Sequence, residues 1–490
     1  MSEIVIKKIF FWVLAILFFL TAPIVVLYTM GYRFSPERGI FIYSGSVTIK
    51  PTPREVNVFI DGKQVPKGII NFLNYSYHVD GLHPGEHSLK VEAPDYYSWF
   101  KKIRIHSGLS TEFWNIFLVR KKYTITTYPT GAVNNFFNSP DNKRVALVEN
   151  GEENKKTTIK IFNIKKNEAE YVFSLDGYYF SDKEKENIEW SPREGLLTVP
   201  LIKSDDGKRE YFVVILGTRE IKNLNGLLGV DKISQVRWSP REKNTVFYIA
   251  NHNLFKVKLN NPDKKILVAN DNVYGYDLSN FNLYYFSGKT GMIYEKSIWG
   301  DGDSTQLTLT PIKVSAGDKF RVIAYDDKRV AIISQNGDLF LFNDGDKGNE
   351  INKLAQNVRG LHFSDDGKKM VFWNNNEIFV YFTRKWETQP IRKEGETIGI
   401  ARFFRKIDNV EWFRDYEHII FSVDGTIKMT ELDSRSVRNM YDIVKLKNKK
   451  PKVIYIGEKD RLLFSDFAGD ANDSTVKELK SLSLSEENKK

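Results

Sequence analysis

Residue patterns that could perform chemistry are few in this sequence. Ser287-Gly288-Lys289-Thr290 is similar to the end of a phosphate-binding loop, but Leu283 stands where that loop requires its first glycine. Asp301-Gly302-Asp303 and Asn343-Asp344-Gly345-Asp346 could offer oxygen ligands to calcium, although neither has the full loop spacing. Asp and Gly in such runs are common turn residues, so we interpret both segments as turns.

Two common catalytic patterns are missing from the sequence. It contains neither a His-Glu-x-x-His zinc motif nor a Gly-x-Ser-x-Gly nucleophile elbow. Paired carboxylates on a propeller scaffold could still hydrolyse a glycosidic bond, and sequence alone does not show which carboxylates meet in space. We therefore predict a non-catalytic protein without metal or cofactor. A membrane-tethered carbohydrate-active hydrolase, with paired carboxylates in a propeller channel, is the alternative.

A cluster of aromatic residues offers one candidate binding site. Tyr96, Tyr97, Trp99 and Phe100 lie close together in the sequence. Aromatic faces pack against the apolar faces of sugar rings, which makes Tyr96, Tyr97 and Trp99 candidates for ligand stacking. The interpretation that we favour is that alternate members of this cluster fill the core of a small domain.

Composition limits the classes of partner. The chain has 490 residues, a formal net charge of +10 and no cysteine. The positive charge is spread thinly over the repeat region, which favours a solvated surface over a nucleic-acid partner. Without cysteine the chain has no disulfide, no thiolate metal site and no cysteine nucleophile.

An apolar segment near the N-terminus could cross a membrane. Ile9 to Tyr32 contains 24 residues without a charge, and about 20 apolar residues span the hydrocarbon core as a helix. Lys7 and Lys8 precede it, so the positive-inside bias keeps residues 1–8 in the cytoplasm and exports the rest. A cleaved signal peptide is the alternative, but its apolar region would be shorter. We predict a retained single-pass anchor at 9–32 in the cell membrane, followed by a linker at 33–44.

Residues 45–120 are predicted to form a small β domain. Apolar and polar residues alternate along short stretches, which is the pattern of half-buried strands. Asp61-Gly62 and Pro84-Gly85 are turn signals between them. The alternating residues include Val47 and Ile49, then Val56, Val58 and Ile60, then Leu89 and Val91.

The same segment resembles the PEGA domain, a β-rich module of bacterial and archaeal surface proteins. The matching residues are Gly45-x-Val47-x-Ile49, Pro53-x-x-Val56-x-Val58-x-Ile60-Asp61-Gly62-Lys63, Leu82-x-Pro84-Gly85-x-His87-x-Leu89-x-Val91, Tyr96-x-x-Trp99 and Gly108. The chain departs from the family pattern at Pro53-Arg54-Glu55-Val56, Gly68-Ile69-Ile70-Asn71 and Asp95. The resemblance implies an extracytoplasmic location, association with the cell envelope and carbohydrate binding, without catalysis.

A motif recurs through the remainder of the chain. Its clearest copies are Ile188-Glu189-Trp190-Ser191-Pro192-Arg193-Glu194 and Val236-Arg237-Trp238-Ser239-Pro240-Arg241-Glu242. Ser191 and Ser239 of these two copies lie 48 residues apart. A repeat of roughly this length on short strands is typical of a β-propeller, and the motif resembles the Trp-Ser-Pro-Asp-Gly-like turn of TolB-type propellers. We predict a propeller at 123–484 with eight blades, or alternatively seven. The equivalent positions are Ser139, Ser191, Ser239, Ser279, Asp326, Ser364, Arg414 and Glu458.

The two ends of the repeat region predict how the ring closes. The last repeat is one strand short, whereas Tyr123-Thr124-Ile125-Thr126-Thr127 stands alone before the first repeat. Pairing between them would remove an open sheet edge. Residues 485–490 are predicted to be a disordered tail.

These observations predict an all-β protein with an N-terminal transmembrane helix, a small β-sandwich-like PEGA domain and a β-propeller. The predicted function is an extracytoplasmic binding or scaffold protein of the cell envelope. Its partners would be the lipid bilayer, through the helix, and a cell-wall glycan or an envelope protein. No nucleic acid and no small-molecule cofactor is expected.

Overall fold

The computed structural model describes residues 3–35, 39–66, 70–71, 75–181, 188–193, 195–300, 302–315, 317–346, 348–469 and 476–485. The predicted tail after Ser485, and Asp301 of one candidate calcium turn, lie outside these residues. The chain divides into two compact units. Unit 1 comprises Met1–Lys122, Glu387–Ile391 and Met429–Ile443, and unit 2 comprises Tyr123–Trp386, Arg392–Lys428 and Val444–Lys490.

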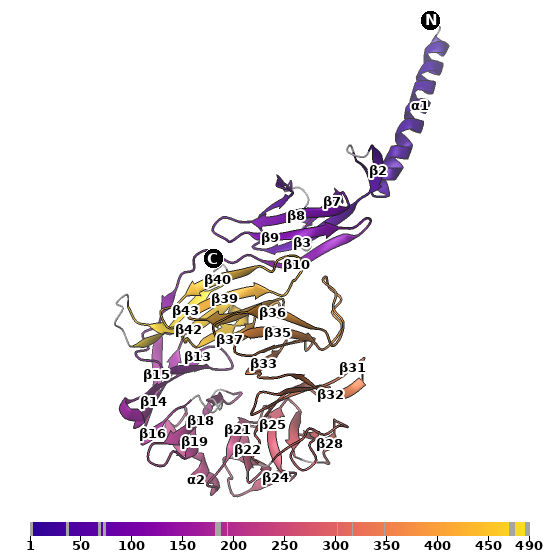
Figure 1. Ribbon diagram of the computed structural model, residues 1–490. Helices are drawn as coiled ribbons and strands as arrows, with labels where there is room; N and C mark the ends of the chain where they lie inside the picture. The colour runs from indigo at the N-terminus through magenta and orange to yellow at the C-terminus, as the bar shows by residue number, and fades with distance from the viewer. Residues whose placement is uncertain are drawn as a thin grey trace. The chain divides into compact units, whose positions relative to one another are not determined.

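Unit 1 begins with one long apolar helix, α1 (Glu3–Thr29), drawn in indigo in Figure 1. Its segment Lys8–Thr29 is long and apolar enough to cross a membrane, which is compatible with a membrane anchor or with a signal sequence. The helix ends before the predicted end of the apolar segment, because Gly31 has a φ of 90° and turns the chain into a strand.

A hairpin occupies most of the segment predicted to be a linker. β1 (Tyr32–Ser35) pairs antiparallel with β2 (Ile40–Tyr43). The ring centroids of Tyr32 and Tyr43 lie 5.1 Å apart, and those of Phe34 and Phe41 lie 5.4 Å apart. Such cross-strand aromatic pairs stabilise antiparallel strands, which explains why this segment is structured.

Two four-stranded sheets share one core in the rest of the N-terminal region of unit 1. The alternating residues identified in the sequence, such as Val47, Val58 and Leu89, point into this core. β10 runs parallel to β3, and the other pairs are antiparallel. In sheet order the strands are β10 (Ser110–Phe117), β3 (Gly45–Thr52), β7 (Ser76–Leu82) and β6 (Ile70–Asn71), then β5 (Lys63–Gln64), β4 (Asn57–Ile60), β8 (Gly85–Glu92) and β9 (Trp99–Ile105).

Residues 126–483 carry a succession of antiparallel sheets built mainly from consecutive strands, which Figure 1 shows following one another around a β-propeller. The first four sheets are β12 (Asn135–Asn138), β13 (Arg144–Asn150), β14 (Lys156–Asn163), β15 (Glu168–Asp176); β16 (Tyr178–Tyr179), β17 (Glu189–Trp190), β18 (Leu196–Lys203), β19 (Arg209–Ile215), β20 (Glu220–Asn223); β21 (Ser234–Trp238), β22 (Thr245–Ala250), β23 (Asn253–Lys258), β24 (Lys265–Ala269); and β25 (Val273–Leu278), β26 (Asn282–Ser287), β27 (Ile293–Ser297), β28 (Thr305–Gln306). A short helix, α2 (Leu224–Leu228), follows β20.

The later sheets continue the same pattern. They are β29 (Phe320–Asp326), β30 (Arg329–Ser334), β31 (Leu339–Gly345), β32 (Gly348–Ala355); β33 (Gly360–Phe363), β34 (Lys369–Trp373), β35 (Glu377–Phe382), β36 (Thr397–Arg402); β37 (Ile407–Trp412), β38 (His418–Val423), β39 (Thr426–Glu431), β40 (Met440–Lys445); and β41 (Val453–Ile456), β42 (Arg461–Phe467), β43 (Lys477–Ser483) with β11 (Thr126–Thr127). The all-β propeller fold is confirmed, and the number of blades, eight or seven, stays a prediction.

The repeated serine closes the hairpin between the first two strands of a sheet. The buried Ser364 hydroxyl donates to Asp366 Oδ1 at 2.6 Å and accepts the Lys369 backbone N–H at 3.0 Å. Ser139 makes the same two contacts, with Asp141 at 2.7 Å and Arg144 at 3.0 Å. The hydroxyl thereby satisfies a buried backbone donor, which explains why serine recurs at this position.

The repeated tryptophan ties one sheet to the next. The indole N–H of Trp238 donates to the carbonyl of Glu189 at 3.1 Å, and that of Trp190 donates to Phe137 at 3.1 Å. Trp412 makes the corresponding bond to His362 at 3.0 Å. The repeated tryptophan therefore has a structural role, because it connects neighbouring sheets.

The predicted ring closure is confirmed by β11. Thr126 and Thr127 pair with Ser481 and Lys480 of β43, so the two ends of the repeat region share one sheet. The hydroxyl groups of Tyr128 and Ser481 lie 3.0 Å apart and extend the closure beyond the two paired residues.

Glu170 provides a measurable test of the sheet β12–β15. Its carboxylate accepts hydrogen bonds from Arg144 Nε at 2.6 Å, Asn163 Nδ2 at 2.9 Å and Lys166 Nζ at 3.0 Å. Burial raises the pKa of Glu170, but these donors outweigh burial and lower the pKa to about 2. Because the pKa in the folded state lies below its ordinary value, the contribution to stability is present above the ordinary pKa and is lost as pH falls towards 2.

We expect Glu170→Gln to lower the free energy of unfolding by about 1–2 kcal/mol at pH 7, a value reduced for solvent screening. Urea denaturation at several pH values would measure the difference between the variant and the wild type, which should shrink towards pH 2. Glu220→Gln is the matched control, because Glu220 and its partner Lys222 are each 51% exposed. An equal effect of both substitutions would contradict the assignment.

Candidate functional site

Charged side chains from consecutive sheets meet at the motif position two residues before the repeated serine. Arg237 on β21 lies between Glu189 on β17 and Asp277 on β25: its Nε is 3.1 Å from Glu189 Oε2, and its Nη1 is 2.9 Å from Asp277 Oδ1. Asp277 Oδ2 also accepts the backbone N–H of Ala324 on β29 at 2.9 Å. One chain of polar contacts therefore joins four sheets.

Within this row of polar contacts, the positive charge of Arg237 lies between the carboxylates of Glu189 and Asp277. Burial raises the pKa of Glu189, and the charge of Arg237 opposes part of that rise. Burial would lower the pKa of Arg237, but the two carboxylates reverse the effect and raise it. Arg237 thus remains a cation between the two carboxylates, so Glu189 and Asp277 are ion-paired rather than free to act as an acid and a base.

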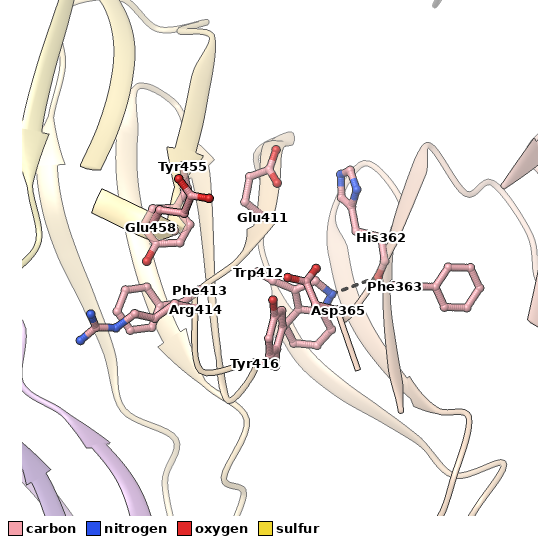
Figure 2. A pocket seen from close by; sticks show the side chains of 11 residues that line it. His362, Phe363, Asp365, Glu411, Trp412, Phe413, Arg414, Tyr416, Tyr455 and Glu458 are labelled. Atoms are coloured by element: carbon pink, nitrogen blue, oxygen red, sulfur yellow. Dashed lines mark hydrogen bonds between the residues drawn. The ribbon is translucent and has the colours of Figure 1, made fainter. Parts of the chain in front are cut away.

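A pocket of about 340 Å³ opens where three sheets meet, and Figure 2 shows the side chains around it. His362 comes from β33, Glu411 and Trp412 come from β37, and Tyr455 comes from β41. Turns that follow these first strands supply the remaining walls. The full lining is His362, Phe363, Asp365, Glu411, Trp412, Phe413, Arg414, Tyr416, Tyr455, Gly457 and Glu458.

Aromatic rings brace the walls of this pocket. The ring centroids of Trp412 and Tyr416 lie 6.1 Å apart edge to face, and those of Phe413 and Tyr455 lie 5.4 Å apart. Trp412 and Phe413 are buried, whereas Tyr416 and Tyr455 are half-buried. The aromatic side chains of the walls are therefore packed against one another in pairs.

The charges at the pocket are mostly acidic. Asp365 and Glu458 are exposed and Glu411 is half-buried. Burial raises the pKa of Glu411, and His362 and Lys452 offset part of the rise.

The cation in the pocket lining, Arg414, already has an acidic partner. Its guanidinium pairs with the carboxylate of Asp460, which also accepts the hydroxyl of Tyr455 at 2.8 Å. The carboxylates of the pocket lining therefore leave a net negative charge facing the cavity.

The aromatic cluster predicted for ligand stacking is placed in unit 1. Trp99 is 1% exposed, lies in the core and donates its indole N–H to Glu431 of the same unit at 2.8 Å. Tyr97 stacks on Tyr441 with ring centroids 5.6 Å apart, and the guanidinium of Arg120 lies over the ring of Tyr96. The stacking expectation is corrected for Trp99, because a buried ring has no face to offer a ligand.

The other sequence candidates lie at strand ends and turns. Asn343, Asp344 and Gly345 end β31 and pair with β32, which corrects the interpretation of that segment as a turn, and only Asp346 follows in a turn. Ser287 donates its hydroxyl to the carbonyl of Asp271 at 2.9 Å, so the phosphate-loop look-alike is part of a turn after β26. Arg384 binds Asn343 Oδ1 and the carbonyl of Asp344, both at 2.8 Å. Within the part of the chain that the structure describes, no group of three or more His, Asp or Glu side chains could hold a metal ion.

His362 and Glu411 are site residues that the sequence analysis did not single out. His362 lies two residues before the motif Ser364, as Glu189, Arg237 and Asp277 lie two residues before their serines, and Glu411 directly precedes the motif Trp412. An alignment of the repeats on the motif would have identified them, because the charge of the residue at this position differs from repeat to repeat.

Comparison with known proteins adds a likeness of fold. No family model matches the chain, and no curated protein matches it. Solved β-propeller structures resemble it at low identity. A eukaryotic initiation factor is 10% identical with a TM-score of 0.46, over 79% of this chain and 91% of that chain. Sqt1 of Saccharomyces cerevisiae is 12% identical with a TM-score of 0.45, over 74% and 98%. Hsv2 of Kluyveromyces lactis is 11% identical with a TM-score of 0.41, over 64% and 98%.

We expect Arg237→Met to lower the free energy of unfolding by about 1–2 kcal/mol at pH 7, because two carboxylates lose their cation. Without the charge of Arg237, which now opposes the effect of burial, the pKa of Glu189 would rise further, so the deficit should shrink as pH falls from 7 to 4. Urea denaturation at each pH would measure it.

Two further variants control this experiment. Adding Glu189→Gln and Asp277→Asn to Arg237→Met should recover part of the loss, because no unpaired charge remains. Arg241→Met changes an arginine of the following turn whose Nε donates to the carbonyl of Asn280 at 3.3 Å and whose guanidinium lies 4.4 Å from the ring centroid of Phe281. Equal losses from Arg237→Met and Arg241→Met would contradict the bridging role of Arg237.

Proposed function

We propose that the protein is a single-pass, membrane-anchored binding protein of the cell envelope whose propeller receives a partner protein at the acidic pocket. The observation on which this proposal rests is the 340 Å³ pocket with Asp365, Glu411 and Glu458 in its lining. A concave site with a few convergent charges is the usual form of a ligand site.

The anchor is supported by α1 and by the residues that flank it. Lys8–Thr29 has the length and composition of a membrane span, and Lys7 and Lys8 favour a cytoplasmic N-terminus. The resemblance of 45–120 to the PEGA domain, and of the repeated motif to TolB-type propellers, agrees with an extracytoplasmic envelope protein. The lipid bilayer is then the first partner, through α1.

The chemistry of the pocket favours a basic peptide segment over a wall glycan. Stacking on sugars needs an exposed aromatic face, whereas Trp412 and Phe413 are buried. Desolvated or partly desolvated carboxylates bind lysine or arginine through charge-assisted hydrogen bonds. A wall glycan is the alternative partner.

One observation favours a second function, the membrane-tethered hydrolase. The raised pKa of Glu411 is the property of a general acid in glycoside hydrolysis, and Asp365 and Glu458 line the same pocket. This function would require wall glycan to be cleaved, which distinguishes it from binding alone.

The proposed orientation can be measured because the chain has no natural cysteine. Phe404 is 94% exposed, so Phe404→Cys should react with a membrane-impermeant maleimide in intact cells. Ser2→Cys, at the N-terminus, should react only after the cells are permeabilised. Protection of Phe404→Cys in intact cells, or labelling of Ser2→Cys in them, would reverse the orientation.

The partner can be tested with a photo-crosslinker in place of Tyr416 in the full-length chain in living cells. We expect one protein to crosslink at Tyr416 and not at the exposed control position Phe404, and the yield to fall at least threefold with Asp365→Asn and Glu411→Gln together, because the acidic charge is removed.

Wall glycan supplies the other arm of this test. Salt-resistant sedimentation of the detergent-solubilised chain with glycan, without a Tyr416-specific crosslink, would assign the pocket to the glycan. Release of soluble sugar that Glu411→Gln abolishes would assign it to hydrolysis. A crosslink insensitive to both acidic substitutions would refute the proposed peptide site.

A further inference from the structure

A second cavity lies between two neighbouring sheets of unit 2. Its volume is about 290 Å³. It is bordered by β31 and β32 of one sheet and by Tyr381 on β35 of the next, with Glu394 supplied by the chain between β35 and β36. The lining is Leu341, Asn343, Gly348, Asn352, Leu354, Tyr381 and Glu394.

Glu394 is a buried carboxylate with an unused oxygen. The residue is 7% exposed, and its Oε2 has no hydrogen-bond partner among the described residues. A buried polar atom without a hydrogen-bond partner destabilises the folded state. A carboxylate that lines a cavity in this state is matched to a ligand that brings a positive charge and N–H donors.

The backbone is shaped to hold this carboxylate. A Cβ atom on Gly345 would collide with the Glu394 carboxylate, so the absence of a side chain at position 345 allows the carboxylate to pack against β31. Glycine here gives the close approach that any larger residue would prevent.

Two arginines near the cavity have acceptors other than Glu394 in the hydrogen bonds that the structure describes. Arg384 donates to Asn343 Oδ1 and to the carbonyl of Asp344, both at 2.8 Å. Arg392 likewise pairs with Glu396 at 2.8 Å. Burial and then the negative charge of Glu394 raise the pKa of the Tyr381 phenol, which places that charge within reach of Tyr381 in the cavity.

We infer that this cavity binds a primary alkylammonium group, such as the side chain of a lysine. Leu341 and Leu354 supply apolar walls for an aliphatic stem, while Glu394 supplies the acceptor for the ammonium and Asn352 a further polar contact. The volume suits one long side chain rather than an extended ligand. The site shares no lining residue with the acidic pocket of the proposed function and goes beyond that function.

Calorimetry on the full-length chain in detergent tests the inference with two matched probes. Nα-acetyl-lysine methylamide should bind saturably, and Nα-acetyl-norleucine methylamide, which lacks the ammonium, should not. Cadaverine is a third probe: if it binds at least tenfold more tightly than the lysine derivative, the ammonium belongs to a free diamine rather than to a polypeptide.

Variants separate binding from folding. Glu394→Gln should weaken the lysine probe at least tenfold while leaving the melting temperature equal or higher, because an unpaired buried charge is removed. Gly345→Ala should weaken it too by displacing the carboxylate. Glu396→Gln, next to the site but paired with Arg392, is the matched control and should bind normally.

Two results would overturn the inference. One is the absence of binding of both lysine probe and cadaverine at millimolar concentration. The other is equal binding by the wild type and Glu394→Gln. Since neither result involves Tyr416 or its crosslinks, failure here would leave the proposed function at the acidic pocket standing.

Discussion

The pairing of β11 with β43 is the constraint on which the propeller depends. A succession of sheets leaves an unpaired edge at each end unless the ends are joined, and exposed edges invite pairing with other chains. Here Tyr128 donates its backbone N–H to Leu479 at 3.0 Å, across most of the length of the chain. The acidic pocket needs this closure, because its Tyr455 wall stands on β41, in the sheet that β11 completes.

Two kinds of polar contact then fix the sheets against one another. The motif tryptophans donate to carbonyls of the preceding sheet, as Trp238 does to Glu189. Because any residue has a carbonyl, the side chain at the accepting position is free to differ between sheets. The accepting residues are Phe137, Glu189 and His362. The equivalent position of other sheets holds Arg237, Asp277 and Glu411. The repeated residues therefore build the scaffold, and the variable residue beside them determines the local chemistry.

Features with a local signal could be predicted from the sequence. The apolar run before Tyr32, the alternation of Val47 and Ile49, the spacing of the repeats and the ring closure all follow from short-range patterns. The pattern of the aromatic cluster also favours a core position for its alternate members, but the hydrogen bond from Trp99 to Glu431 could not be predicted, because Glu431 lies 332 residues away. The unpaired oxygen of Glu394 could not be predicted from the sequence either. Whether that oxygen has a partner among the described residues depends on side chains of other strands, which are distant in the sequence.

The charge of the whole chain is a poor guide to its ligands. A formal net charge of +10 suggests an anionic partner, yet both cavities present carboxylates. Charges on an open surface are screened over about 8–10 Å in physiological salt, so dispersed lysines contribute little at a particular site. Burial raises the pKa of Glu411, and Oε2 of the buried Glu394 has no hydrogen-bond partner among the residues that the structure describes. Salt screens partly desolvated charges much less. The sign of the charges in the two cavities is therefore a better guide to a ligand than the net charge of the chain.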